Sequence, residues 1–243
     1  MKQKNIIIIG GFGLIGRAFI NNADNNKNNL IIIDRKYLRT KNKIDFYKSN
    51  IEQKKSLLNT FKKIFSNYKQ IDAVVNLSYP KNKHWGKKFE KIDEIDIKNN
   101  LFLQLGTSIL IAQTVIPFFL KQKFGNLILT SSILGVLPPK FEHYKNTNIH
   151  CPIEYSASKS GIIAVTKYLA KLYGKKKIRV NCISPGGIKD NQSKLFLKKY
   201  KNSCLSKGML DPNDISGAIY FLISDNSNFV NGQNIIIDDG WSL

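Results

Sequence analysis

Short, uninterrupted runs of isoleucine, valine and leucine alternate with longer segments of mixed polarity along the whole chain. The short runs are continuous rather than alternately polar, which is typical of strands in a parallel sheet covered on both faces. The longer segments have the length and spacing of amphipathic helices. This order predicts an α/β Rossmann fold, a doubly wound parallel sheet of about seven strands with helices on both faces. The strands that can be placed are Asn5–Ile9, Leu30–Ile33, Ala73–Leu77, Asn126–Leu129, Arg179–Ile183 and Asn234–Ile237, and the helices are Leu14–Asn22, Glu52–Asn67, Leu101–Gln122, Ile153–Tyr173 and Asp211–Ser224.

The strand–helix order predicts a single domain over residues 1–243, because no repeat, linker or change of composition interrupts it. We expect the cofactor-binding part at about residues 1–125 and the catalytic and substrate-binding part at about 126–243. The most irregular stretch, Pro138–Pro152, is interpreted as an inserted loop beside the substrate, in which Lys140 and Lys145 would meet an anionic group; a surface loop remote from the site is the alternative.

The charge of the chain is its unusual property, because 38 basic and 17 acidic residues give a net charge of +21. Such a charge suggests a nucleic-acid or anionic-membrane partner. The lysines, however, form short scattered groups without an arginine-rich arm, so we expect solvated lysine surfaces and no nucleic-acid partner; a preference for anionic substrates is the alternative. Three cysteines cannot form a disulfide framework and fit a reducing compartment.

Two apolar stretches raise the question of a membrane. The N-terminal run Ile6–Ile9 is too short for a signal peptide and leads into glycines, which favours a buried strand. Leu101–Leu120 has nearly the length of a membrane span but contains many polar groups, which favours a helix in a protein core or a subunit contact. We therefore expect a cytoplasmic protein without a membrane partner.

A glycine-rich loop follows the first strand. Gly10 permits a tight turn, Gly13 permits close approach of a pyrophosphate, and Gly16 permits close helix–strand packing. The second strand ends at Asp34, which lies 34 − 16 = 18 residues after the last glycine, where a carboxylate can bind both ribose hydroxyls of adenosine. An ordinary glycine turn followed by a capping aspartate is the alternative. The combination predicts NAD as the cofactor, with NADP disfavoured because Asp34 repels a 2′-phosphate.

A tyrosine and a lysine share one face of the helix that follows the inserted loop. Tyr155 and Lys159 are four residues apart. A nearby ammonium stabilises a phenolate, so we expect the pKa of Tyr155 to lie below its usual value of about 10 and the phenol to act as an acid/base. Ser131 and Ser132 end a strand at the edge of the sheet where such folds bind ligands, and they offer a hydroxyl to the substrate.

Taken in order along the chain, these motifs resemble the short-chain dehydrogenase/reductase family. The resemblance implies an NAD(P)-dependent oxidoreductase that interconverts a secondary alcohol and a ketone. It implies Tyr155 as acid/base, Lys159 as the group that binds the nicotinamide ribose and lowers the Tyr155 pKa, and Ser132 as the residue that orients the substrate carbonyl. The family also implies a homodimer or homotetramer. The cofactor-binding residues that it implies are Gly10, Gly13, Leu14, Ile15, Gly16, Asp34, Asn50, Ile51, Asn76, Tyr155, Lys159, Pro185, Gly186 and Ile188.

A narrower resemblance is to the oxidoreductases of bacterial flagellin-modification and nonulosonic acid gene clusters, carried by segments such as 138–142, 184–188 and 236–240. It implies a sugar or sugar-derived substrate. The chain departs from the family pattern at Asn50, where an aspartate is usual, at Asn76–Tyr79, where Asn-Asn-Ala-Gly is usual, and at Gln104, which replaces the asparagine of a proton relay.

Two other functions stay open from the residues. A dinucleotide-binding sensor or scaffold would be expected to lack Tyr155 or Lys159, and both are present. A sugar epimerase or dehydratase has a similar glycine spacing but usually needs an additional substrate domain, for which 243 residues leave no room. The histidines His84, His143 and His150 lack metal-ligand spacing, so we expect no metal site and interpret all three as loop or surface residues.

Overall fold

The computed structural model describes residues 3–23, 28–147 and 149–243. Its centre is one parallel sheet of seven strands in the order β3-β2-β1-β4-β5-β6-β7. The predicted Rossmann fold is confirmed. The strands are β1 (Lys4–Ile9), β2 (Asn28–Asp34), β3 (Asp45–Lys48), β4 (Ala73–Asn76), β5 (Gly125–Thr130), β6 (Ile178–Pro185) and β7 (Asn234–Ile237).

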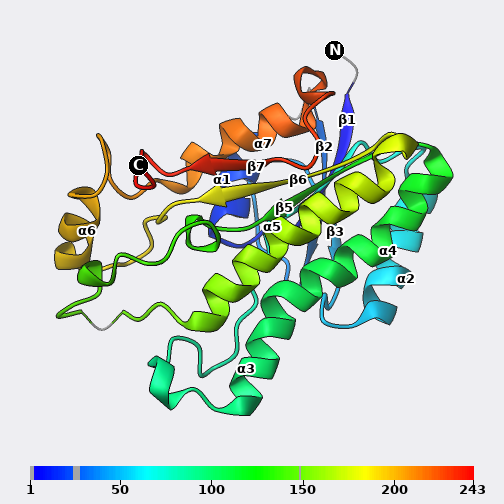
Figure 1. Cartoon of the computed structure of the whole chain (residues 1–243). Helices are drawn as coiled ribbons and strands as arrows, with labels where there is room; N and C mark the ends of the chain where they lie inside the picture. Colours follow the sequence, from blue (N-terminus) through cyan, green and yellow to red (C-terminus); the bar gives the residue numbers. More distant parts are fainter. Residues whose placement is uncertain (1–2, 24–27, 148) are drawn as a thin grey trace.

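Helices cover both faces of the sheet (Figure 1). One face carries α2, α4 and α5, and the other carries α1 and α7, whereas α6 lies beyond the carboxyl ends of β6 and β7. The helices are α1 (Leu14–Asn21), α2 (Lys54–Asn67), α3 (Glu94–Leu101), α4 (Thr107–Gln122), α5 (Ile153–Tyr173), α6 (Lys194–Lys201) and α7 (Ser216–Ile223).

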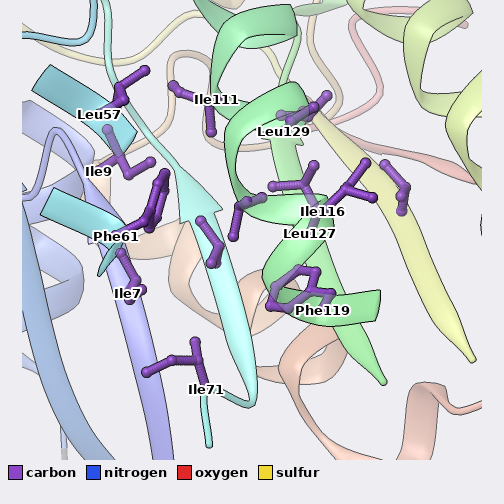
Figure 2. Packing of buried hydrophobic residues seen from close by; sticks show 14 of the residues in the cluster. Ile7, Ile9, Leu57, Phe61, Ile71, Ile111, Ile116, Phe119, Leu127 and Leu129 are labelled. Carbon is purple, nitrogen blue, oxygen red and sulfur yellow. The ribbon is translucent and has the colours of Figure 1, made fainter. Parts of the chain in front are cut away.

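The central strands are apolar on both sides because each side meets helices. In β1, Ile7 and Ile9 belong to the core under α2, α4 and α5, which Figure 2 shows, whereas Ile6 and Ile8 belong to the core under α1 and α7. All four side chains are completely buried. Burial of each side chain contributes about 1.5–3 kcal/mol to the stability of the fold. None of these four positions faces solvent, so none of them favours a polar residue.

The prediction from the sequence missed three elements, β3, α3 and α6, and it misplaced the start of two helices. The edge strand β3 is only four residues long and half-exposed, and it has no continuous apolar run. Helices α3 and α6 are short and largely polar, so they were missed as well. The helix predicted from Leu101 is continuous with α3 through a π-helical turn, Phe102–Gly106, and the helix predicted from Asp211 starts with the 3-10 turn Pro212–Ile215.

Among the described residues, the helical stretch Glu94–Gln122 has the length and composition of a membrane span. Its inner face instead packs into the core, where Ile111, Val115 and Phe119 are completely buried. This packing agrees with the predicted core helix.

The sheet places the loops that follow β1 and β4 next to each other. These two strands are paired, but the chain leaves β1 toward β2 on one side and β4 toward β5 on the other. Such a point of reversal opens a crevice at the carboxyl ends of the strands.

Candidate active site

A cleft of about 1140 Å³ lies at this point of reversal, along the carboxyl edge of the sheet. The structure brings most of the predicted site residues to it. Those that line the cleft are Gly10, Gly13, Leu14, Ile15, Asp34, Ile51, Ser132, Tyr155, Lys159, Pro185, Gly186 and Ile188.

The glycine loop forms the floor of one end of the cleft. Gly10 has φ +74°, and a Cβ there would lie 2.6 Å from the Cα of Ser78, so only glycine fits this turn. Gly13 precedes α1, and in the described part of the chain no side chain caps this helix and no acidic residue occupies its first turn. The start of α1 thus lines the cleft and carries no acidic competitor in its first turn, as an anion-binding helix start requires.

Asp34 lies at the end of β2, beside this loop. Its carboxylate accepts hydrogen bonds from the backbone N–H of Phe12 (3.0 Å) and of Arg35 (2.7 Å). The Arg35 guanidinium forms an ion pair with Glu52. The positive charge next to Asp34 is thus partly neutralised.

Three predicted residues lie behind the lining of the cleft rather than in it. Gly16 permits the packing of α1 on the loop, because a Cβ there would lie 2.5 Å from the carbonyl oxygen of Gly10. The Asn76 side chain accepts hydrogen bonds from the N–H and the hydroxyl of Ser78, and the Asn50 side chain accepts one from the N–H of Glu52. These three residues therefore hold the loops that line the cleft rather than lining it themselves.

Ser132, Tyr155 and Lys159 come together at the centre of the cleft. Ser132 precedes a 3-10 turn after β5 and accepts a hydrogen bond from the N–H of Leu134 (3.2 Å), and its hydroxyl is close enough to Tyr155 to affect the pKa of the phenol. Lys159 is 3% exposed, and its Nζ lies 5.5 Å from the centre of the Tyr155 ring and donates to the carbonyl oxygen of Thr130 (3.0 Å). The three side chains therefore form one group, held by β5 and α5.

The joint between β5 and α5 is tight. A Cβ at Gly135 would lie 2.6 Å from the carbonyl carbon of Lys159, so the turn after β5 packs directly on the α5 backbone. Ser131 donates its hydroxyl to the carbonyl oxygen of Lys159 (2.7 Å). Ser131 thereby fixes the helix, which leaves Ser132 as the hydroxyl that meets Tyr155.

The expected lowering of the Tyr155 pKa is wrong for this structure. Burial raises the pKa of Tyr155 to about 12, with the Ser132 hydrogen bond acting in the opposite direction. Burial also lowers the pKa of Lys159 to about 8. The sequence spacing showed that the two groups are near each other but not that Lys159 is buried and Tyr155 half-buried, and desolvation disfavours the charged form of each.

The sequence missed an aromatic corner that adjoins this group. Tyr79, Trp85 and Tyr155 meet edge to face, with each pair of ring centres 5.9 Å apart, and all three line the cleft. Tyr79 stands where the family pattern has a glycine, which was the only signal for this corner in the sequence.

The inserted loop borders the cleft through Tyr144, Ile149 and Cys151 rather than through its lysines. Lys140 instead lies over the Trp241 ring at 4.6 Å and donates to the Trp241 carbonyl oxygen, and Lys145 does not line the cleft. The expected contact of these two lysines with an anionic substrate is therefore not supported by their positions.

His143 lies in the inserted loop, as one part of the interpretation of the histidines has it, but it is not a surface residue. It is 2% exposed, its Nε2 lies 2.9 Å from the hydroxyl of Ser203, and burial lowers its pKa. Within the described ranges, no three histidine, cysteine or acidic side chains lie close enough together to hold a metal ion.

Gln104 lies in the π-helical turn and is 3% exposed. Its Nε2 donates to the carbonyl oxygen of Pro80, in the loop after β4. Its Oε1 is buried without a hydrogen-bond partner among the described residues. Its amide thus supports the loop that carries the aromatic corner.

The chain is similar to known proteins in both sequence and structure. A family model described as enoyl-(acyl carrier protein) reductase matches residues 23–242. A post-translational flagellin modification protein A of Campylobacter coli is 42% identical, with all of both chains covered. A 7alpha-hydroxysteroid dehydrogenase of Bacteroides fragilis is 28% identical over 100% of this chain and 95% of its own. A crystal structure of a short chain dehydrogenase from Leptospira borgpetersenii with bound NAD+ has a TM-score of 0.90 and 27% identity, and covers 100% of this chain and 94% of that one.

Proposed function

The chain belongs to the short-chain dehydrogenase/reductase family and is an NAD(P)-dependent oxidoreductase, and we propose that it interconverts a secondary alcohol and a ketone on a sugar or sugar-derived substrate. The observation that carries this proposal is the convergence of Ser132, Tyr155 and Lys159 in the cleft that also contains the glycine loop. A sensor without turnover would not need this group.

The glycine loop fits a dinucleotide. The Gly10 turn and the uncapped start of α1 leave space for a phosphate group, and a side chain at Gly13 would narrow this space. Asp34 lines the same part of the cleft. We propose that α1 binds the pyrophosphate, that Asp34 binds the adenosine ribose and that NAD(H) is preferred over NADP(H). Asn50, Ile51, Asn76, Pro185, Gly186 and Ile188 would complete this cofactor site.

The bound nicotinamide supplies or accepts the hydride. In the reductive direction, Ser132 orients the substrate carbonyl with its hydroxyl, and the Tyr155 hydroxyl donates its proton to the same oxygen. A pKa of about 12 means that Tyr155 holds this proton at neutral pH and can act as the acid. In the oxidative direction, the tyrosine acts as the base only after its phenol has released its own proton to solvent, and the phenolate oxygen then takes the proton of the alcohol. Lys159 holds the nicotinamide ribose with its ammonium and stabilises the tyrosine when it is deprotonated.

The similarity to the flagellin modification protein supports the proposal of a sugar substrate. We propose that the reaction of this chain also serves the modification of flagellin. The cleft suits a polyhydroxylated ring, since it combines aromatic walls with polar groups such as Lys81, Asn191 and Gln192. We propose residues 1–125 as the main cofactor part and 126–243 as the main catalytic and substrate part, working in the cytoplasm.

We also propose a homodimer or homotetramer. Apolar side chains on the outer faces of α4 and α5 support it, because Ile109, Tyr168 and Leu172 are exposed there. Size-exclusion chromatography with light scattering would show a single subunit mass if this proposal is wrong.

The function is tested by offering the purified enzyme NAD+ and a panel of alcohols while NADH absorbance is followed. The panel contains pyranoses supplied free, as sugar phosphates and as nucleotide sugars, with cyclohexanol and propan-2-ol as secondary alcohols that are not sugars. We expect the highest kcat/KM with a member of the sugar group. Oxidation of the simple alcohols alone would refute the sugar substrate, and no turnover of any alcohol would contradict the alcohol chemistry.

A further inference from the structure

The loop that carries Trp85 lies between β4 and α3 and contains no regular element where it meets the cleft. Trp85 is half-buried, with its ring against both Tyr79 and Tyr155. Aromatic contacts of this kind are individually weak. They do not by themselves hold an irregular loop in one place, so the loop needs a second anchor.

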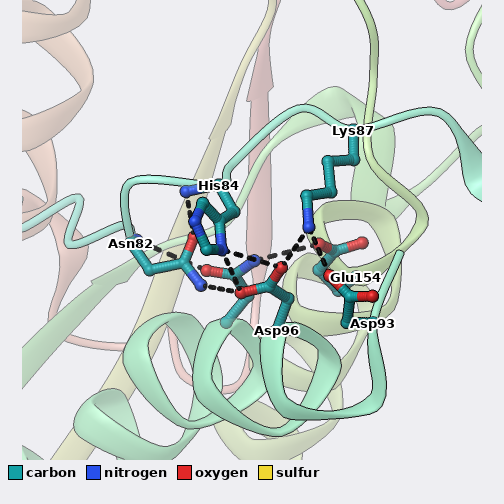
Figure 3. A network of polar contacts seen from close by, with 7 residues as sticks. Asn82, His84, Lys87, Asp93, Asp96 and Glu154 are labelled. Carbon is teal, nitrogen blue, oxygen red and sulfur yellow. Dashed lines mark hydrogen bonds and ion pairs between the residues drawn. The ribbon is translucent and has the colours of Figure 1, made fainter. Parts of the chain in front are cut away.

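A buried carboxylate on α3 supplies that anchor. Asp96 is 3% exposed and accepts hydrogen bonds from Asn82 (2.8 Å) and Lys87 (2.8 Å), and its carboxylate lies 3.0 Å from the Nδ1 of His84 (Figure 3). Two of these three partners precede Trp85 in the chain and one follows it. One carboxylate thus holds both sides of the segment that presents the indole to the cleft.

The same cluster is connected to the helix that carries the catalytic tyrosine. The backbone N–H of Asn82 donates to the side chain of Asn100 (3.4 Å), and the Asn100 amide donates to the carboxylate of Glu154 (3.0 Å). Asn100 and Glu154 are buried, and Glu154 directly precedes Tyr155. The loop and the start of α5 are therefore fixed with respect to each other through α3.

We propose that Asp96 is a positioning residue that holds Trp85 beside Tyr155, and that Trp85 in this position is a specificity-determining wall of the substrate site. The proposal rests on the proposed function, because it assumes that the substrate reacts at Tyr155. A ring-shaped substrate bound with its reacting carbon between Ser132 and Tyr155 would meet the indole, whereas a small acyclic alcohol would leave it untouched.

The substitution Asp96→Asn tests the anchor with little change of shape. It replaces one acceptor oxygen by an NH2 group that faces the donor of either Asn82 or Lys87, so one of these two contacts is lost. Asp93→Asn is the matched control, because Asp93 also pairs with Lys87 but its side chain is 66% exposed and does not contact the other two partners.

The first measurement is the emission of Trp85. The chain has two tryptophans, so Trp241→Phe leaves Trp85 as the only indole. In this background, Asp96→Asn should shift the emission to longer wavelength and raise the acrylamide quenching constant roughly twofold as the loop opens, and Asp93→Asn should do neither. An unchanged quenching constant in Asp96→Asn, with NADH titration and circular dichroism confirming a folded protein, would overturn the anchor.

The second measurement compares cyclohexanol with propan-2-ol in the chain that retains Trp241. Asp96→Asn and Trp85→Ala should lower kcat/KM for cyclohexanol by roughly 10- to 100-fold, the effect of a substrate displaced by about 1 Å, and should change that for propan-2-ol much less. Trp85→Phe should restore part of the loss. Equal losses for both alcohols would overturn the specificity role, since a general structural defect lowers both.

The outcomes also separate this proposal from the proposed function. If the panel contains no sugar substrate but Asp96→Asn exposes Trp85 and lowers the cyclohexanol preference, the sugar assignment fails and the positioning role stands. If the enzyme turns over neither alcohol but oxidises a sugar of the panel, that sugar replaces cyclohexanol in the comparison, and an unchanged kcat/KM in Trp85→Ala overturns the specificity role.

Discussion

Replacing Lys159 with methionine should make the cofactor-free protein more stable while it removes activity. Lys159 is 3% exposed, and burial lowers its pKa from 10.5 to about 8. Below pH 8 the folded protein must hold an ammonium that is desolvated, whereas the unfolded chain holds it in water. The folded state is therefore destabilised at neutral pH by the same group to which we assign a role in the reaction.

The size of this penalty follows from the difference between the two pKa values. A fall from 10.5 to about 8 corresponds to about 3 kcal/mol of stability lost at pH 7. Because the folded-state pKa is the lower one, the penalty is complete below about pH 8 and disappears as the pH rises toward 10.5. At about pH 9.5 roughly 1 kcal/mol remains.

Methionine removes this penalty but also removes one hydrogen bond. The Lys159 ammonium donates to the carbonyl oxygen of Thr130 at 3.0 Å, and loss of such a bond costs about 1–2 kcal/mol. The free energy of unfolding of the variant should thus exceed that of the native protein by about 1–2 kcal/mol at pH 7. At about pH 9.5 the two free energies should be nearly equal. The decisive quantity is the decrease of about 2 kcal/mol between the two pH values.

Urea unfolding followed by circular dichroism, without cofactor, measures the free energy of unfolding of both proteins at the two pH values. Other titrating groups are common to both, so the difference isolates Lys159. Lys167→Met, an exposed lysine on the same helix, is the control and should leave the pH dependence unchanged. The same Lys159→Met protein should bind NAD(H) more weakly, because it lacks the ammonium that we propose holds the ribose.

A difference in stability that stays constant between the two pH values would refute the reasoning, since a desolvated ammonium must produce a pH-dependent term. A variant that is less stable than the native protein at pH 7 would show that the Thr130 bond outweighs the cost of desolvation.

Three further perturbations test the catalytic group and the cofactor site. Tyr155→Phe should lower turnover by roughly 10²–10⁴-fold with NAD(H) affinity retained; steady-state kinetics that show full activity would remove Tyr155 as the acid/base. Asp34→Ser should reduce the preference for NAD(H) over NADP(H) in fluorescence titrations, and tighter NADP(H) binding by the native enzyme would contradict the role of Asp34. Gly16→Ala should raise the NAD(H) dissociation constant roughly tenfold, because its Cβ would lie 2.5 Å from the Gly10 carbonyl oxygen. Gly217→Ala is the control and should not change this constant, because its Cβ would meet nothing within 4 Å. Equal NAD(H) affinities of the two variants would argue against this packing requirement.

The central sheet could be predicted from the sequence because burial on both faces produces continuous apolar runs such as Ile6–Ile9. The edge strand β3 could not, since it is half-exposed and lacks such a run. The positions of Ser132, Tyr155 and Lys159 were also predictable, because strand ends and i, i+4 spacing fix where these side chains lie.

The electrostatic state of this group and its aromatic wall required the structure. Spacing along a helix does not say how much water reaches Tyr155, and this decides that its pKa rises rather than falls. Trp85 lies 155 − 85 = 70 positions before Tyr155, and their contact depends on a loop held by Asp96. No periodicity or local motif records a contact of this kind.

The aromatic corner also determines how this chain can be recombined with its relatives. Tyr79 and Trp85 belong to the first half of the sequence, but they stand against Tyr155 in the second. A chimera joined near residue 125 would inherit the dinucleotide loop of one parent together with part of that parent's substrate wall. A designer who wishes to exchange cofactor preference alone should place the junction before Leu77, so that the glycine loop and Asp34 are transferred and the indole stays with the tyrosine it contacts.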